Sequence, residues 1–146
     1  MKDHRKDTEK DPLTGKVIGF AIEVHRHLGP GLMESAYETC LCYELSQAGI
    51  PFERQAPLPV RYKEVHLDCG YRMDIVVDKR LVIELKTVEK LLPIHDAQLL
   101  TYLKLSGIRV GLLLNFNEAV LRDGIKRIVC GQNSLCLCVS VVISRQ

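Results

Sequence analysis

The chain has 146 residues, of which 47% are hydrophobic, so it is long enough for one domain with a buried core. Its 20 basic and 18 acidic residues leave a net charge of +2, too small to argue for nucleic-acid binding by itself. It contains no run of about 18 apolar residues, which argues against a membrane span. We therefore expect a single domain over residues 13–130, after a flexible tail (1–12) and before an apolar segment (131–146) of unassigned role.

Two helices are predicted at the start of the domain. The first has Thr14 as its expected N-cap and ends before Gly29-Pro30-Gly31, because that tripeptide cannot continue a helix. Its apolar positions, at helical spacing, are Val17, Ile18, Ala21, Val24 and Leu28. The second helix ends at Gly49. Its expected apolar stripe is Met33, Ala36, Tyr37, Cys40, Leu41 and Leu45.

After Gly49 the apolar residues alternate, which predicts strands. Turns are expected at Lys63-Glu64 and Asp78-Lys79, so the segment is predicted to form a three-stranded meander. The segments with strand character are 58–62, 65–67, 71–77 and 81–85.

A third helix and further strands complete the predicted fold. Residues 93–105 return to helical spacing, with Pro93 in the first turn and Gly107 as the stop. The apolar run 110–114 predicts a strand buried on both faces, and another strand is expected at 125–129. Residues 134–143 suit an edge strand or an oligomer contact. The order ααβββαβ predicts a mixed α/β fold, with a central sheet flanked by helices.

Charged residues interrupt two of these strands. Glu84 and Lys86 stand two positions apart, so their side chains share one face of the strand. Asp74 lies among apolar residues of the preceding strand. Burial of such charges is costly unless they are paired or bind an ion. If the two strands form a hairpin, Asp74 and Glu84 can lie opposite each other, where a divalent cation would remove their repulsion.

This arrangement predicts a metal-dependent nuclease centre. Mg²⁺ or Mn²⁺ held by Asp74 and Glu84 would lower the pKa of a bound water and stabilise charge on a phosphodiester. Lys86 would orient that water or neutralise the pentavalent phosphorane. The structural alternative is a surface aspartate beside an ordinary Glu–Lys ion pair.

The predicted third helix offers further candidates. His95, Gln98 and Tyr102 lie at i, i+3 and i+7, so they share a polar face. Gln98 and Tyr102 could hold a phosphate or a base, and Gln98 could hold Lys86 in place. The alternative is an amphipathic helix with solvated polar residues.

Other charged residues have both structural and functional interpretations. Glu34 begins the second helix, where the helix dipole stabilises a carboxylate, and it could also complete the metal site. Of His25 and His27, we expect one to pack and one to face solvent, with a metal role for His25 less favoured. Basic side chains that could contact a phosphate backbone, or form a solvated face, are Lys79, Arg80, Lys86, Lys90, Lys104 and Arg109, then Arg122, Lys126 and Arg127.

The six cysteines include no C-x-x-C pair, and most lie among apolar residues, as expected of reduced, buried thiols. Because the charged N-terminus also lacks the apolar stretch of a secretory signal, we expect a cytoplasmic protein. An iron–sulfur cluster is the alternative that we do not favour, because its spacing departs from that of nucleases that hold one. Its ligands would be Cys40 or Cys42 with Cys130, Cys136 and Cys138.

The chain resembles the GxxExxY family, whose motif is here Gly31, Glu34 and Tyr37. The resemblance runs from about Asp11 to Val129. The segments that match are 25–32, 84–86, 95–103, 111–116 and 124–127. That family is placed in the PD-(D/E)XK nuclease superfamily, and its Gln-x-x-x-Tyr helix is similar to that of RecB-like exonucleases.

The resemblance implies a restriction-endonuclease-like fold. It also implies Asp74 and Glu84 as metal ligands, Lys86 as the catalytic lysine and Gln98 as an active-site helper. Glu34 matches the family glutamate and is a candidate third metal ligand. One departure is that a methionine precedes Asp74 where the superfamily motif has proline.

The favoured function is a Mg²⁺- or Mn²⁺-dependent nuclease acting on DNA, in repair or DNA processing. Tyr102, His95 and Lys90 are the predicted substrate contacts. The alternatives are a non-catalytic nucleic-acid- or partner-binding module of the same fold, and a small subunit that works within a homodimer or a larger complex. The sequence leaves open DNA versus RNA and endonuclease versus exonuclease.

Overall fold

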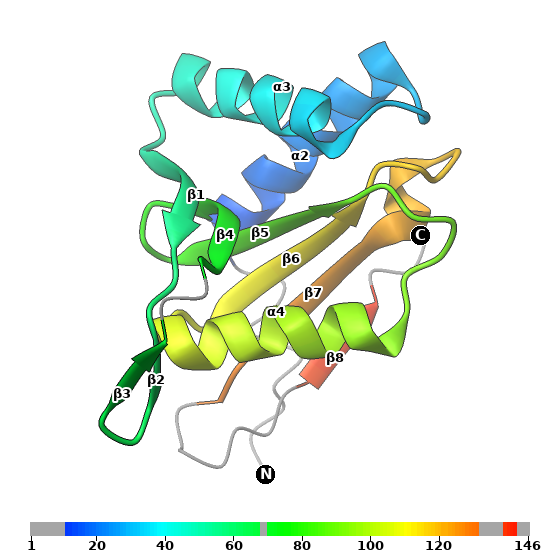
Figure 1. Cartoon of the computed structure of the whole chain (residues 1–146). Helices are drawn as coiled ribbons and strands as arrows, with labels where there is room; N and C mark the ends of the chain where they lie inside the picture. Colours follow the sequence, from blue (N-terminus) through cyan, green and yellow to red (C-terminus); the bar gives the residue numbers. More distant parts are fainter. Residues whose placement is uncertain (1–10, 68–69, 132–138, 143–146) are drawn as a thin grey trace, which may run out of the picture.

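A six-stranded sheet lies between two helical layers. The computed structural model of the chain describes residues 11–67, 70–131 and 139–142. Helices α2 (Pro12–Leu28) and α3 (Glu34–Gln47) cover one face of the sheet, and α4 (Pro93–Ser106) covers the other (Figure 1). The predicted α/β class, with helices flanking a central sheet, is therefore confirmed.

The sheet has the strand order β1-β4-β5-β6-β7-β8. Its strands are β1 (Phe52–Pro57), β4 (Arg72–Val77), β5 (Leu81–Lys86), β6 (Val110–Asn115), β7 (Ile125–Val129) and β8 (Val139–Val142). A 3-10 turn, η1 (Leu121–Gly124), precedes β7. β5 and β6 run parallel and the other neighbouring pairs run antiparallel, so the sheet is mixed. A parallel pair needs a crossover connection, which α4 provides.

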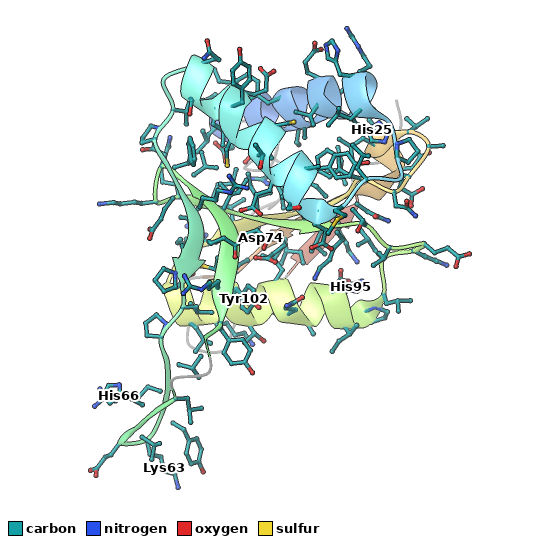
Figure 2. All side chains as sticks on the ribbon, turned by 45° about the horizontal axis from the view of Figure 1, so that its top comes forward. His25, Lys63, His66, Asp74, His95 and Tyr102 are labelled. Atoms are coloured by element: carbon teal, nitrogen blue, oxygen red, sulfur yellow. The ribbon has the colours of Figure 1, made fainter. Side chains whose placement is uncertain are left out.

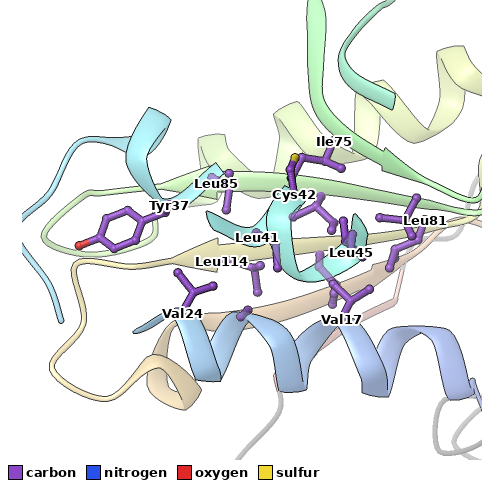
Figure 3. Packing of buried hydrophobic residues seen from close by; sticks show 14 of the residues in the cluster. Val17, Val24, Tyr37, Leu41, Cys42, Leu45, Ile75, Leu81, Leu85 and Leu114 are labelled. Carbon is purple, nitrogen blue, oxygen red and sulfur yellow. The ribbon is translucent and has the colours of Figure 1, made fainter. Parts of the chain in front are cut away.

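The two faces of the sheet form separate hydrophobic cores. The first core joins α2 and α3 to the sheet and includes the fully buried Tyr37 (Figure 3). Ile83 of β5 belongs to the same core. The second core joins α4 to the opposite face and includes Leu99 and Val82. Because neighbours such as Val82 and Ile83 enter different cores, β5 is apolar on both faces.

The predicted three-stranded meander is wrong about which strands form it. β2 (Val60–Tyr62) and β3 (Val65–Leu67) form a separate two-stranded hairpin that projects from the main sheet (Figure 1). β4 pairs with β5, as expected, and its neighbour on the other side is β1, a strand that was not predicted from the sequence. β1 is an edge strand in which Ala56 is the buried residue, so its apolar alternation is too weak to distinguish it.

Two details at the helix starts also differ from prediction. The N-cap of α2 is Asp11 and not Thr14, because an Asp11 carboxylate oxygen accepts from the Leu13 backbone N–H (3.1 Å). Thr14 lies inside the first turn and donates its hydroxyl to the other Asp11 oxygen (2.6 Å). Met33, predicted in the apolar stripe, is 76% exposed because it is the extended residue before α3.

Part of the apolar C-terminal segment completes the sheet. Val139–Val142 pairs antiparallel with β7 and forms an edge strand, one of the two roles expected for this segment. Residues 132–138 and 143–146 lie outside the described residues, as do residues 1–10 of the predicted tail. Within the part of the chain that the structure describes, the helices are too short or too polar to cross a membrane.

The contact between α4 and β6 predicts opposite effects for two glycine substitutions. A Cβ on Gly111 would lie 2.8 Å from Leu99 Cδ1, so the fully buried Leu99 side chain would have to shift within the packed core. We expect Gly111→Ala to lower the free energy of unfolding by about 1–3 kcal/mol, measured by urea denaturation. The control is Gly19→Ala in α2, where a Cβ meets open space, and it should raise stability by roughly 0.5–1 kcal/mol. Equal stabilisation by both substitutions would contradict this packing.

Candidate active site

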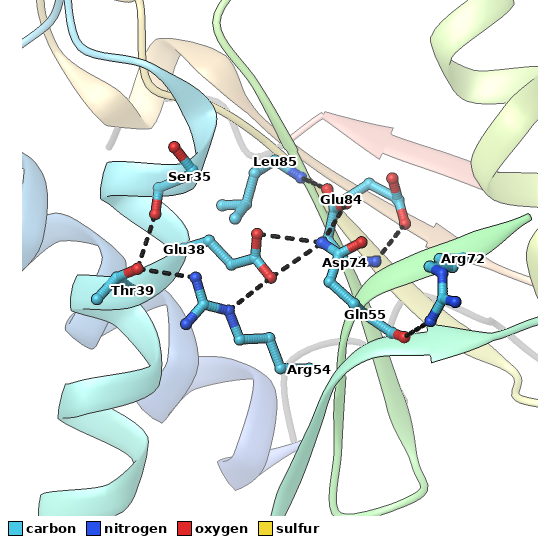
Figure 4. Close-up of polar contacts among 9 residues, drawn as sticks. All are labelled: Ser35, Glu38, Thr39, Arg54, Gln55, Arg72, Asp74, Glu84 and Leu85. Atoms are coloured by element: carbon cyan, nitrogen blue, oxygen red, sulfur yellow. Dashed lines mark hydrogen bonds and ion pairs between the residues drawn. The ribbon is translucent and has the colours of Figure 1, made fainter.

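The acidic pair lies where β4 and β5 separate. The backbone ladder pairs Ile75 with Ile83, and one step further Asp74 stands opposite Glu84. There the side chains take over the pairing (Figure 4). The Asp74 backbone N–H donates to Glu84 Oε1 (3.1 Å), and the Leu85 N–H donates to Asp74 Oδ2 (2.9 Å). The two carboxylates therefore lie side by side on one side of the hairpin, as the sequence predicted.

Burial and repulsion keep this pair from ionising fully. Glu84 is 3% exposed, and burial, followed by the charge of Asp74, raises the pKa of Glu84 to about 8. Burial also raises the pKa of Asp74, while the hydrogen bond from the Leu85 amide partly offsets that rise. Near neutral pH the pair therefore retains a proton, which a bound cation would displace.

Lys86 is held beside the pair by a chain of hydrogen bonds from α4. Lys86 Nζ donates to Gln98 Oε1 (2.9 Å), and Gln98 Nε2 donates to the Tyr102 hydroxyl oxygen (2.9 Å). The expected contact between Gln98 and Lys86 is thus present. Tyr102 is 7% exposed, and burial raises the pKa of its hydroxyl. Figure 2 shows Asp74 between α3 and α4, with Tyr102 on the α4 side.

Glu34 approaches the centre from the start of α3. Partial burial raises the pKa of its carboxyl, the nearby Lys86 ammonium lowers it, and the charge of Asp74 raises it again. Glu34 is therefore within electrostatic reach of both residues. Among the residues that the structure describes, however, no group of three or more His, Cys, Asp or Glu side chains is close enough to hold an ion. The role of Glu34 as a third ligand remains a prediction.

The rest of the GxxExxY motif shapes the turn before α3. Gly31 has a positive φ of 102°, which favours glycine. The Tyr37 hydroxyl donates to the Gly29 carbonyl oxygen (2.6 Å) and accepts from the Leu32 N–H (3.1 Å). The Tyr37 ring also stacks on Phe116, with centroids 4.4 Å apart. Tyr37 therefore fixes the turn that places the first residue of α3.

Three histidines have structural partners. His95 Nδ1 accepts from the Leu92 N–H (2.9 Å) and so caps α4, which leaves its predicted substrate contact untested. His25 is buried and donates from Nε2 to the Glu118 carbonyl oxygen (2.8 Å). His27 is exposed and pairs with a glutamate on its own helix. The expectation that one of these two packs and the other faces solvent is confirmed.

The basic residues do not form the two clusters considered from the sequence. Lys79 and Arg109 lie at the end of the sheet where β5 and β6 begin, whereas Lys86 ends β5 and Lys90 follows it. Lys90 is exposed in the loop between β5 and α4, and its substrate contact remains a prediction. In the second group, Arg122 lies in η1, before the strand that holds the other two residues.

Consecutive side chains of β7 point to opposite faces, which separates the remaining two basic residues. Lys126 forms an ion pair with Asp96 of α4. Arg127 is 5% exposed and lies 3.8 Å from the Asp11 carboxylate at the start of α2. These two cations therefore cannot contact one phosphate backbone together.

Two polar residues of the site were not predicted. Glu38 is 6% exposed and lies one turn after Glu34, a spacing that places both on one side of α3 and could have indicated it. Gln55 comes from β1, and its Nε2 lies 3.0 Å from Glu38 Oε1 and 3.5 Å from Asp74 Oδ1 (Figure 4). No local sequence pattern indicates Gln55.

The cysteines that the structure describes are divided between the two cores. Cys40 and Cys42 pack in the core under α2 and α3, while Cys130 belongs to the core under α4. Because the sheet separates these cores, neither early cysteine lies on the same face as Cys130. Cys136 and Cys138, the other ligands of the disfavoured iron–sulfur alternative, lie outside the described residues.

The donor set fits a hard divalent cation. Asp74 and Glu84 offer adjacent carboxylate oxygens, and burial together with the charge of Asp74 makes the ionised form of Glu84 unfavourable, a cost that a bound cation would remove. Carboxylate oxygens are the ligands that Mg²⁺ and Mn²⁺ prefer. A lysine on the same face completes an arrangement suited to phosphate chemistry.

Fold and site together have the arrangement of a restriction-endonuclease-like protein, with an acidic pair and a lysine on neighbouring strands. The family model of the PD-(D/E)XK nuclease superfamily matches residues 11–128. That match covers most of the chain, so the chain belongs to the PD-(D/E)XK nuclease superfamily. Nucleases of this superfamily generally use divalent metals such as Mg²⁺. No curated protein and no solved structure matches the chain.

The raised pKa of Glu84 predicts that the metal-free protein loses stability as pH rises from about 5 to 8. In this window the folded state keeps a proton that an unfolded glutamate, with a pKa near 4.3, has already lost. The free energy of unfolding therefore falls with pH, by a few kcal/mol in total, since each pKa unit corresponds to about 1.4 kcal/mol. Urea denaturation across this range should show the fall in the wild type and a clearly flatter profile in Glu84→Gln. Parallel profiles would contradict the buried, protonated glutamate.

Proposed function

We propose that the chain is a Mg²⁺- or Mn²⁺-dependent nuclease that hydrolyses phosphodiester bonds in DNA. The observation that supports this most strongly is the convergence of Asp74, Glu84 and Lys86 at one point of the sheet. A protein that used this fold only as a scaffold would have no need to bury two repelling carboxylates beside a lysine.

Asp74 and Glu84 would hold the cation. When bound, the ion supplies a water of lowered pKa and stabilises the charge that develops on the phosphate. Hydrolysis adds water across one P–O bond, so that the hydroxyl joins phosphorus and the leaving oxygen takes a proton. Loss of the Glu84 proton accompanies binding of the cation, so cation affinity should increase with pH.

Lys86 and its partners on α4 would act on the phosphate. The Lys86 ammonium would stabilise the negative charge of the pentavalent transition state. Gln98 accepts a hydrogen bond from one of the three N–H groups of Lys86, which fixes the ammonium and leaves the other two for phosphate or water. Tyr102 in turn holds Gln98, so the lysine is positioned before substrate arrives.

Several further residues would assist the ion and the substrate in this nuclease. The motif geometry around Tyr37 supports membership of the GxxExxY family, in which Glu34 would assist the ion from the start of α3. His95 and Lys90 would contact the nucleic-acid backbone beside Tyr102. With DNA as the substrate, we also propose a role in repair or DNA processing.

We also propose that the protein works in a reducing compartment such as the cytoplasm, which suits the buried thiol of Cys42. Burial raises the pKa of Cys42 to about 11, so its thiol stays protonated and unreactive at physiological pH. The proposal therefore requires no oxidising environment for folding.

A non-catalytic nucleic-acid- or partner-binding module is the second candidate. One observation favours it: Asp74 and Glu84 can share a proton, so their arrangement does not require a bound ion. A subunit that acts only within a homodimer or a larger complex could likewise keep this carboxylate pair protonated and stable without a bound ion. Metal binding and cleavage by the isolated chain distinguish these candidates from an enzyme.

Two substitutions at the centre should separate metal binding from chemistry. Asp74→Asn should abolish calorimetric Mn²⁺ binding and cleavage, because it removes a charged ligand. Lys86→Gln should keep Mn²⁺ binding and lower kcat by about 10²–10³-fold, since it removes one stabiliser of transition-state charge. Labelled single- and double-stranded DNA and RNA, tested with Mg²⁺ and with Mn²⁺, identify the substrate.

The matched control is Lys16→Gln on α2, an exposed lysine on the opposite face of the sheet, which should behave as wild type. Cleavage that persists undiminished in Lys86→Gln would assign the activity to another site or a contaminant. Mn²⁺ binding without cleavage of any substrate would favour the non-catalytic module.

A further inference from the structure

Asp74 has a polar neighbour from each side of its strand. Toward β5, the Leu85 N–H donates to Asp74 Oδ2 (2.9 Å). Toward β1, Gln55 Nε2 lies 3.5 Å from Asp74 Oδ1. Each oxygen of this carboxylate therefore faces one donor, and the rotation of the group is restricted from both sides.

The Gln55 side chain is itself held by a buried carboxylate. Gln55 Nε2 lies 3.0 Å from Glu38 Oε1 and 3.1 Å from Glu38 Oε2, so the amide nitrogen bridges Glu38 and Asp74. Arg54 Nε also donates to Glu38 Oε1 (3.0 Å), which balances the buried charge. Only the NH₂ end of the amide can donate to two carboxylates, so its orientation is determined.

The backbone of β1 is distorted at this position. The ladder pairs Arg54 with Ile75 and Ala56 with Met73, but it omits the intervening pair. Gln55 has a φ of +52°, in the left-handed region that non-glycine residues seldom adopt. Arg72 Nη1 donates to its carbonyl oxygen (3.2 Å) and supports this conformation. Such strain persists where the surroundings impose it, often at functional sites.

We propose that Gln55, anchored by Glu38, is a positioning residue that orients the Asp74 carboxylate for binding of a divalent cation. This inference rests on the proposed nuclease function. The contact with Asp74 is at the long end of the hydrogen-bond range, so it contributes little to folding. Its effect is to limit the orientations of a ligand, in the way that outer-shell partners tune metal sites.

The test uses Gln55→Asn in the full chain. Asparagine tolerates the left-handed backbone and keeps the amide, but it is one methylene too short to reach both carboxylates. We expect a modest fall in the unfolding midpoint in urea, because the buried Glu38 carboxylate loses a hydrogen-bond donor. We also expect about 10-fold weaker Mn²⁺ affinity by calorimetry and a comparable fall in kcat, with KM little changed.

Two further variants distinguish positioning from general structural effects. Glu38→Gln weakens the hold on the Gln55 amide and is expected to lower stability. Measured on the protein that remains folded, its Mn²⁺ affinity should be lower than that of the wild type. Lys79→Asn is the matched control, because Lys79 also has a positive φ (56°) but lies in the β4–β5 turn, at the far end of the hairpin. It should leave Mn²⁺ affinity and kcat at wild-type values.

The outcomes separate this inference from the function on which it rests. Wild-type Mn²⁺ affinity and kcat in Gln55→Asn would overturn the positioning role and leave the nuclease proposal intact. A lower unfolding midpoint with unchanged Mn²⁺ affinity in the folded protein would likewise assign Gln55 a structural role and overturn it. If the wild type neither binds Mn²⁺ nor cleaves any substrate, the nuclease proposal fails and the inference fails with it.

Discussion

Two carboxylates held together, that of Glu84 buried and that of Asp74 half-buried, are the constraint on which the rest of the site depends. Asp74 and Glu84 face each other where β4 and β5 separate, and backbone amides at the same point hold both side chains. Burial and repulsion make full ionisation unfavourable, as the raised pKa of Glu84 reports. The fold therefore maintains an electrostatic cost that either a proton or a divalent cation removes.

The elements on the two faces of the sheet contribute opposite charges to this point. From α3, Glu34 and Glu38 bring further negative charge toward Asp74. From the α4 side, Gln98 holds the Lys86 ammonium, the cation nearest to the pair in this network. In the proposed nuclease, a phosphate would meet the ion and the lysine together. Acidic groups from α3 and a lysine held by α4 therefore meet at the acidic pair, because the sheet is covered by different helices on its two faces.

Sequence reasoning succeeded where the relevant contacts are local. Asp74 and Glu84 belong to one hairpin, so alternation along each strand places them on one side, and Gln98 and Tyr102 are one helical turn apart. The strand β1 could not be predicted in this way, because this edge strand buries too little apolar surface for its sequence to alternate between apolar and polar residues. Gln55 was missed with it, and its left-handed backbone has no signature in the neighbouring residues.

The sequence by itself determined the fold class, the acidic pair with its lysine, and the helix that supports them, because strand and helix periods operate over a few residues. The tertiary structure decided which other segments of the chain contact Asp74 and Glu84. It split the basic residues between different ends and faces of the sheet. It also joined Glu38, Gln55 and Asp74 across separations of 17 and 19 residues. Such contacts depend on how α3 and β1 pack together, and packing of distant segments leaves no local period in a sequence.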